Sequence, residues 1–414
     1  MIYDIIIIGG GMAGLYTQYK LLKKNKNKKI LLIEKNGRLG GRVYTHNTIV
    51  KNKKYSMEAG AGRFNDNHKY LKKLINELGY SNKVFKIPSK VNHIPTKSKW
   101  KKSEISKYSP YDYMDYIINN IELTHSMKGV SFNKWLNKNI SKDIVQYLKD
   151  FYPYKDIFKI NAYDALNLYK IDLNVNNTFY ILGGGLTQLV DGMEKKIKKN
   201  KGTILLNTEL KSIENIEEHY LLKTNNNNYT CKKIVLTGQR PDLLKINYLN
   251  DIKKIIQSVS NASLCRFYFI FDTKKCAWFK NIKKTITDTR LSYFIPIDYE
   301  TGLVMISYVD EHNADYLKKM EMKSKSKLVK FLLKECEKIF GLSNIPNPIW
   351  TKSFYWENGV GDWKAGFDSK TIEKIMTKPF KDENLFICGE NYSSTFQCWI
   401  EGALDTSEKV LKKI

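Results

Sequence analysis

The amino-acid sequence predicts an α/β fold, in which a Rossmann-like domain carries an inserted domain of α+β type. Three observations support this prediction. At the N-terminus an apolar run over 5–8 leads through a glycine-rich turn into a helical pattern. A second apolar run, over 385–388, comes shortly before the last helical pattern of the chain. The 414 residues exceed what one ordinary hydrophobic core accommodates, so we expect two domains.

The glycine-rich turn has the spacing of a dinucleotide-binding site. Gly9 permits the tight turn, Gly11 lets the backbone approach a pyrophosphate, and Gly14 lets the helix pack on the strand. Glu34 ends the next strand, and we expect its carboxylate to be free for ribose hydroxyls. A carboxylate at this position repels a ribose phosphate and therefore disfavours NADP. The residues of the turn that we expect at the dinucleotide are Gly9, Gly11, Met12, Ala13 and Gly14.

Hydrophobic periodicity predicts the other elements in order along the chain. Apolar residues at helical spacing predict helices over 12–25, 68–79, 111–121, 131–150, 156–170, 186–199 and 325–340. Apolar runs and alternating patterns predict strands over 203–214, 219–223, 234–238, 262–271, 291–297 and 302–309. The middle of the chain is therefore a helical insertion, followed by a sheet that one helix covers. The glycine triplet at 183–185 either turns the chain back to the first domain or forms a hinge.

The residues after Glu34 favour a flavin over a nicotinamide. The segment Gly-Arg-Leu-Gly-Gly-Arg at 37–42 places two guanidinium groups where they share the charge of a pyrophosphate. With Glu-Ala-Gly-Ala-Gly-Arg-Phe at 58–64, Leu-Phe-Ile-Cys-Gly-Glu at 385–390 and Gln-Cys-Trp-Ile-Glu-Gly-Ala at 397–403, the chain resembles the FAD-dependent amine oxidases. This family includes monoamine, polyamine and L-amino-acid oxidases. The resemblance covers both ends of the chain and is looser in the middle.

The resemblance implies a bound FAD and a two-domain organisation. It places the FAD-binding domain at 1–80, 180–260 and 365–414, and the substrate-binding domain at 81–179 and 261–364. Val360 and Gly361 stand where monoamine oxidases have a flavin-linking cysteine and a tyrosine, so we expect non-covalent FAD. The Glu390 carboxylate would reach the ribityl chain, and the last helix would direct its positive end at the flavin ring. Beyond the turn, the expected FAD-binding residues are Glu34, Lys35, Arg38, Gly41, Arg42, Gly60, Ala61, Gly62, Arg63, Leu210, Gly389, Glu390, Trp399 and Ile400.

The same resemblance names candidates for catalysis at the reactive edge of the flavin. Trp399 matches an aromatic residue that faces the ring, although a core tryptophan at a helix start is the alternative. Trp356 or Trp363 would supply a second aromatic wall, or would simply pack. Arg266 stands where the family has a lysine that holds a water beside N5, which puts the reactivity towards oxygen in question. Its alternative role is an ion pair with a structural carboxylate.

Arg63 decides the expected substrate. The matching arginine of L-amino-acid oxidases binds the substrate carboxylate with both nitrogens, and the alternative is that Arg63 braces the flavin or a loop. The resemblance implies oxidation of a primary or secondary amine, with an α-amino acid favoured, to an imine while molecular oxygen becomes hydrogen peroxide. Two alternatives stay open. One is a desaturase or isomerase of similar fold, and the other is a flavin-bearing binding module with vestigial activity.

Composition gives the background for these candidates. The net charge is +27, but only six of the 69 basic residues are arginine, which is typical of a genome rich in A and T. Lysine runs then indicate solvated loops, and nucleic-acid binding stays open without being favoured. Six cysteines without CxxC spacing, no signal peptide and no transmembrane segment predict a cytoplasmic protein with reduced thiols. The histidines at 46, 68, 93, 125, 219 and 312 lack metal-ligand spacing, so we expect them in loops or at the surface and expect no metal.

Overall fold

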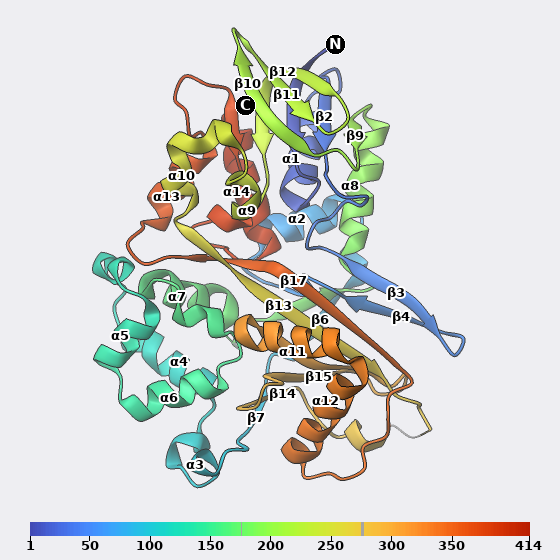
Figure 1. Ribbon diagram of the computed structural model, residues 1–414, viewed down its shortest axis with the longest axis vertical. Coiled ribbons are helices and arrows are strands. Elements are labelled where there is room, and N and C mark those ends of the chain that lie inside the picture. Colours follow the sequence, from blue (N-terminus) through green and yellow to red (C-terminus); the bar gives the residue numbers. More distant parts are fainter. Residues whose placement is uncertain (175, 275–276) are drawn as a thin grey trace.

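A mainly parallel sheet forms one lobe of the molecule, the upper lobe in Figure 1. The computed structural model describes residues 1–174, 176–274 and 277–414. Strand β1 (Ile2–Ile8) lies between β2 (Ile30–Ile33) and β12 (Asn228–Leu236), and both pairings are parallel. Their isoleucines and leucines suit a sheet that is covered on both faces. The order is β10-β11-β12-β1-β2-β9, and β18 (Leu385–Ile387) also pairs with β12.

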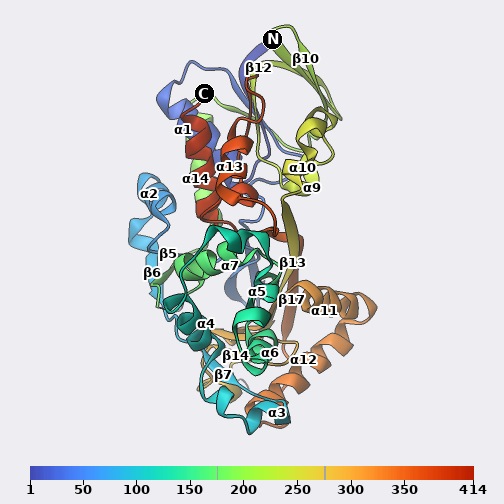
Figure 2. The same cartoon turned by 90° about the vertical axis from the view of Figure 1, so that its left-hand side faces the viewer.

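The helices of this lobe bring the two ends of the chain together. Helix α1 (Met12–Lys24) packs against α14 (Ile400–Leu411) and α8 (Thr187–Lys199). The hydroxyl of Tyr16 donates to Glu408 at 2.5 Å, which joins the first helix to the last. Both termini therefore lie in this lobe (Figures 1 and 2).

The second sheet lies in the other lobe and begins from two long antiparallel strands, β13 (Val259–Ile270) and β17 (Trp350–Trp363). Its order is β17-β13-β16-β15-β14-β7. The helices α11 (Glu311–Lys323) and α12 (Lys325–Phe340) cover one face, across the long strands from helices α4–α7 (Figure 2). The other strands of this sheet are β7 (Asn92–Ile94), β14 (Thr285–Thr287), β15 (Tyr293–Asp298) and β16 (Leu303–Asp310).

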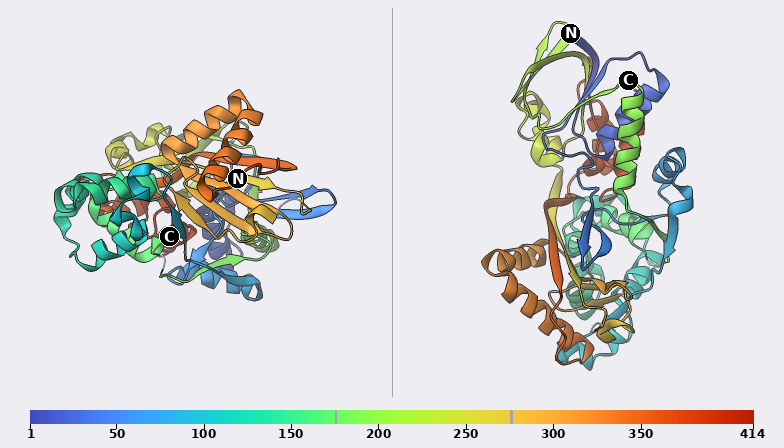
Figure 3. Two further views of the ribbon diagram at one scale, coloured as in Figure 1. Left: turned by 90° about the horizontal axis from the view of Figure 1, so that it is seen from below. Right: turned by 90° about the vertical axis from the view of Figure 1, so that its right-hand side faces the viewer.

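Smaller elements connect the lobes. The hairpin of β3 and β4 projects from the side of the body (Figures 1 and 3), and β5, β8 and β6 form a short sheet. No helix in the described ranges is long and apolar enough to cross a membrane. The bounds not yet given are β3 (Thr45–Val50), β4 (Lys53–Glu58), β5 (Phe64–Asn65), β6 (Val84–Ile87), β8 (Phe179–Leu182), β9 (Thr203–Leu205), β10 (Leu210–Ile216), β11 (His219–Thr224), α2 (Lys69–Glu77), α3 (Ser98–Lys101), α4 (Pro110–Asn119), α5 (Phe132–Asn139), α6 (Lys142–Phe151), α7 (Ala162–Leu168), α9 (Arg240–Leu243), α10 (Lys253–Ile256) and α13 (Ser369–Thr377).

The predicted fold class is confirmed, but several element boundaries were wrong. The helix expected over 131–150 is broken into α5 and α6, because Ile140 is extended and the Ser141 side chain caps the second helix. The helix expected over 156–170 starts later, at Ala162, where the side chain of Asn161 accepts from the backbone N–H of Asp164 at 2.9 Å. The strand expected over 203–214 is two strands, and α11 was not predicted.

Candidate active site

A cavity of about 1380 Å³ runs between the two lobes, from the turn after β1 to the open face of the second sheet. With the exception of Gly14 and Trp363, every residue that the sequence proposed for the cofactor or for catalysis lines this cavity. Segments distant in sequence therefore meet around one space. The space is large enough for a dinucleotide together with a small substrate.

The turn after β1 forms an open cradle at one end of the cavity. Helix α1 begins at Met12 after Gly11, which provides no side-chain cap, so its first N–H groups and the positive end of its dipole face the cavity. A Cβ atom built on Gly11 would meet no atom within 4 Å, which leaves room for a ligand against the backbone. Gly14 does not line the cavity because it packs on the turn itself, where a Cβ would lie 1.9 Å from the carbonyl oxygen of Gly9.

The Glu34 carboxylate is not free, contrary to the expectation. Its Oε2 accepts from the backbone N–H of Gly10 at 2.7 Å, and its Oε1 accepts from the backbone and side-chain nitrogens of Asn36 at 2.8 and 2.6 Å. These donors fix the carboxylate at the end of β2, where it lines the cavity. A ribose would use the acceptor capacity that remains. Nearby, Lys35 forms an exposed ion pair with Asp242, and Leu210 lines the same end.

The arginines of the 37–42 segment are also engaged. Arg38 donates to the carbonyl oxygens of Leu39 and Gly41 at 3.1 and 2.7 Å. Arg42 donates to a carboxylate oxygen of Glu390 at 2.5 Å, and this contact joins the two ends of the chain. Glu390 also accepts from the backbone N–H of Gly361 at 3.1 Å. The roles expected for Arg42 at the pyrophosphate and for Glu390 at the ribityl chain stay predictions.

The last helix directs its N-terminus into the cavity. Trp399 occupies the cap position without a side-chain hydrogen bond, and Ile400 begins the helix. Both residues line the cavity. The indole N–H of Trp399 is buried and has no hydrogen-bond partner among the described residues. An orphan donor next to a helix N-terminus fits a ligand that carries acceptor atoms, such as a flavin ring.

His68 packs against Trp399. It lies in the connection before α2, as one of the expected positions allowed, but it is buried and not at the surface. Its side chain is completely buried, and its ring lies edge-on to the Trp399 ring with centroids 4.8 Å apart. Its Nε2 is 2.9 Å from Oδ1 of Asp172, which is equally buried. The sequence could not show this, because Asp172 is distant along the chain. Its carboxyl group offsets the free-energy cost of burying the imidazole.

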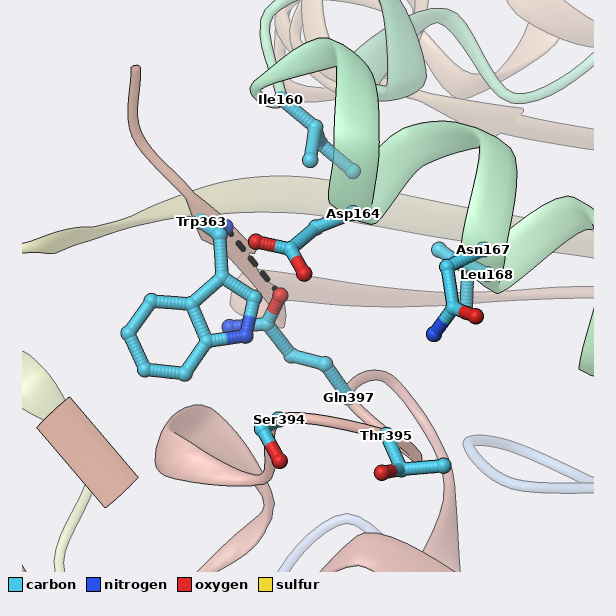
Figure 4. A pocket seen from close by; sticks show the side chains of 8 residues that line it. All are labelled: Ile160, Asp164, Asn167, Leu168, Trp363, Ser394, Thr395 and Gln397. Carbon is cyan, nitrogen blue, oxygen red and sulfur yellow. Dashed lines mark hydrogen bonds between the residues drawn. The ribbon is translucent and has the colours of Figure 1, made fainter. Parts of the chain in front are cut away.

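The structure separates the two tryptophans considered for a second aromatic wall. Trp356 lines the cavity, and its indole N–H donates to the carbonyl oxygen of Ala59 at 2.7 Å. Trp363 lies instead in a small pocket with room for about one water, and its backbone N–H donates to Gln397 there (Figure 4). Its indole N–H donates to the carbonyl oxygen of Ser393. Trp363 is therefore a packing residue.

Arg266 lines the cavity from the middle of β13. One Nη donates to the carbonyl oxygen of Glu58 at 3.0 Å, so its partner is a main-chain oxygen and not the carboxylate considered as an alternative. The guanidinium lies 4.8 Å from the centre of the Tyr308 ring. Burial by itself lowers the pKa of Arg266, but the neighbouring Tyr268 and Tyr308 raise it above its ordinary value. Arg266 is thus permanently charged, and its buried Nε has no partner in the described part of the chain.

Arg63 lies inside the cavity among aromatic rings. Its guanidinium is 4.2 Å from the centre of Phe179 and 5.8 Å from that of Trp399. One Nη donates to the hydroxyl of Tyr154 at 3.0 Å. Burial lowers the pKa of Arg63, but Tyr154 and Tyr293 outweigh it and raise the pKa above its ordinary value. Within the ranges described, no carboxylate forms an ion pair with this cation.

Sequence reasoning missed several residues of this end of the cavity. They are Tyr154, Lys284, Tyr293 and Tyr308. Tyr293 and Tyr308 lie in the β-rich segments that predicted strands over 291–297 and 302–309, but nothing in the pattern said which sheet face meets the flavin end. Tyr154 and Lys284 lie in connections, where no periodic signal exists.

The fold and the site together define a class. A Rossmann-like dinucleotide cradle, an uncapped last helix and a cluster of aromatic rings beside it are typical of an FAD-dependent oxidoreductase.

Comparison with known proteins gives the family. The family model described as flavin containing amine oxidoreductase matches residues 146–410, and a model for an NAD(P)-binding Rossmann-like domain matches 7–78. The chain belongs to the flavin-containing amine oxidoreductases, and FAD is its cofactor.

Similar proteins agree with this membership. Achacin of Lissachatina fulica is 22% identical, over 99% of this chain and 92% of achacin. The flavin-dependent L-tryptophan oxidase RebO of Lentzea aerocolonigenes is 23% identical, over 99% of this chain and 97% of its own. Among solved structures, a putrescine oxidase bound to putrescine has a TM-score of 0.74 at 13% identity, over 100% of this chain and 99% of that one. That likeness shows the fold.

Proposed function

We propose that this amine oxidoreductase is an oxidase of primary or secondary amines, with α-amino acids as the preferred substrates. The amine loses two electrons and two protons and becomes an imine, while molecular oxygen takes them up and becomes hydrogen peroxide. Water then hydrolyses the imine to a carbonyl compound and ammonia or an amine. Bound FAD supplies the two-electron acceptor for this chemistry.

The observation that carries the preference for amino acids is the state of Arg63. A guanidinium inside a protein cavity normally faces a carboxylate, because an unpaired charge away from water is costly. Arg63 instead contacts the hydroxyl of Tyr154 and the rings of Phe179 and Trp399. The carboxylate of an α-amino acid would supply the missing anion and would bind with two hydrogen bonds. The similarity to an L-tryptophan oxidase supports the same choice.

The surrounding side chains would orient the substrate and exclude water. With its carboxylate on Arg63, a substrate would place its α-carbon beside Trp399, at the N-terminus of the last helix. Trp356 lines the same cavity and would form the second aromatic wall. Arg266 would hold a positive charge next to the ring, and it cannot exchange protons as a lysine does.

Replacement of Arg63 by alanine tests the proposal. We expect the KM for α-amino acids to rise by about 10- to 100-fold, because one charge-assisted contact is lost. The KM for simple amines of similar side chain should change little. A peroxide-coupled assay on matched pairs, such as an amino acid and its decarboxylated amine, measures both.

Arg63→Lys serves as the control, since it keeps the charge but not the planar guanidinium. Its KM for α-amino acids should lie between those of the wild type and of Arg63→Ala. Equal losses on amino acids and amines would remove Arg63 from the substrate site. Anaerobic mixing with the same panel tests the oxidase chemistry itself, because bleaching of the yellow flavin requires electron transfer from the amine. A flavin that no amine bleaches would contradict the proposed function.

A further inference from the structure

Lys284 lines the same cavity as Arg63 and has no role in the amine oxidation proposed above. It immediately precedes β14 and lines the cavity, and its backbone carbonyl accepts from the N–H of Asn92 at 2.9 Å. Its Nζ is 5.5 Å from the centre of the Tyr293 ring. The Tyr293 ring lies 5.9 Å from that of Tyr154, which in turn holds Arg63. The two cations thus face one aromatic cluster.

Neither cation is neutralised by the protein. No ion pair or side-chain hydrogen bond of the Lys284 ammonium is found among the described residues, and Arg63 likewise lacks a carboxylate. The cation Lys128 shows the usual arrangement: its side chain is 7% exposed and lies 2.6 Å from Asp368. Burial, together with the positive charge of Arg63, lowers the pKa of Lys284 to about 7.

The acids that line the cavity pair with neither cation in the part of the chain that the structure describes. They are Glu34, Glu58, Asp156, Glu209, Asp242 and Glu390. The carboxyl group of Asp156 interacts with Glu311, Asp310 and Lys159, and burial raises its pKa to about 6. The charged group that acts on Lys284 is Arg63. This end of the cavity therefore holds the charge of Arg63 and, whenever Lys284 is protonated, a second positive charge beside it, and a bound anion would stabilise both.

We infer that Lys284 forms a second anion subsite and that the substrate is an α-amino dicarboxylic acid. Arg63 would bind the carboxylate next to the reacting carbon, and Lys284 would bind the carboxylate of the side chain. This inference rests on the proposed function for the identity of the substrate. The subsite itself rests only on the paired cations, so binding without turnover tests it separately.

The test uses the FAD-loaded protein and unreactive acids. Succinate and glutarate are titrated against butyrate, with the change in the flavin absorbance spectrum as the signal. The dicarboxylates should bind about 10- to 100-fold more tightly than butyrate, as expected for one additional charged contact. Lys284→Met should abolish this difference, and Lys284→Arg should retain most of it. Lys280→Met changes the net charge equally at an exposed position outside the cavity and should leave the difference intact.

Four outcomes overturn the subsite. Butyrate binding as tightly as succinate would show that both cations share one carboxylate. If Lys280→Met lost the preference for dicarboxylates as fully as Lys284→Met, the preference would come from the net charge of the protein and not from a subsite. Retention of the difference in Lys284→Met would remove the residue from the subsite. In Lys284→Met, an equal fall in kcat on all amino acids, with a shifted pH profile and an unchanged preference for dicarboxylates, would make Lys284 a proton acceptor instead.

Turnover then separates the subsite from the proposed function. If glutamate and aspartate bleach the flavin with a lower KM than leucine, and Lys284→Met reverses that order, both the subsite and the proposed oxidase function are supported. Selective binding of dicarboxylates without bleaching by any amine would support the subsite and contradict the oxidase.

Discussion

At the scale of single residues, the site is distinguished by which charges the protein neutralises and which it leaves alone. Arg42 is paired with Glu390, and Glu34 accepts from backbone and side-chain donors. Both belong to the dinucleotide end of the cavity. Arg63 and Arg266 instead contact phenol groups and main-chain oxygens. Their charges remain available, which is the property expected of groups that meet a substrate or a reduced ring.

His68 offers a residue-scale prediction about the support of Trp399. His68→Ala removes the partner of the buried Asp172 and empties the space behind the indole ring. Because a buried carboxylate is left with Asn65 alone, the free energy of unfolding should fall by about 3–5 kcal/mol. Urea denaturation measures this loss, and the visible spectrum of the flavin should shift. Asp172→Asn keeps a neutral acceptor and should cost less; an unchanged stability in His68→Ala would contradict the role.

At the scale of elements, strand register places Arg266, Tyr308 and Tyr293 in one row across three neighbouring strands at the flavin end of the cavity. Arg266 on β13 stands opposite Tyr308 on β16, and Tyr308 stands opposite Tyr293 on β15. The sequence predicted these strands from their β-rich composition, but the row itself depends on bulges after Phe267 and after Tyr293. A bulge changes the register and the face of every later side chain, and it leaves no clear trace in a hydrophobic pattern. That is why the strands could be predicted and the row could not.

The junction of β16, β17 and the turn at Lys155–Phe158 gives an element-scale prediction. Burial raises the pKa of Asp156 to about 6, and burial with the Asp156 charge raises that of Asp310 as well. An acid whose pKa is higher in the folded state contributes stability at low pH and loses it as pH rises through that pKa. Asp156→Asn removes this loss, and its amide can donate to Asp310.

The melting temperature of Asp156→Asn should therefore exceed that of the wild type above pH 6, and the gain should disappear below about pH 4. Thermal unfolding of the two apoproteins between pH 4 and 8 measures the difference. The exposed Asp251→Asn is the control and should show no such trend. A gain that is constant over the whole range would show that the carboxyl group of Asp156 is not the cause.

At the scale of the whole molecule, the cavity forms only where distant parts of the chain meet. The ends supply Gly11, Arg42 and Glu390, and the inserted segments supply Tyr154 and Lys284. The dinucleotide end could be predicted because its chemistry is local: a turn needs glycines at fixed spacing, whatever the rest of the chain does. At the other end, the resemblance named Arg63 and Trp399, but Tyr154 and Lys284 could not be predicted because packing between the lobes places them.

This assembly also predicts how FAD leaves the protein. Val360 and Gly361 offer no thiol, and Cys398, which lines the cavity, donates its S–H to the carbonyl oxygen of Gly361 at 3.3 Å. Burial, together with Asp362, raises the pKa of the Cys398 thiol well above its ordinary value and so disfavours the reactive thiolate. Acid precipitation should therefore release all flavin into the supernatant. The apoprotein should melt at a lower temperature, and FAD at 100 times its Kd should restore about 2.7 kcal/mol. A yellow pellet would contradict non-covalent binding, and its disappearance in Cys398→Ser would locate the bond, since a tether at that position needs this sulfur.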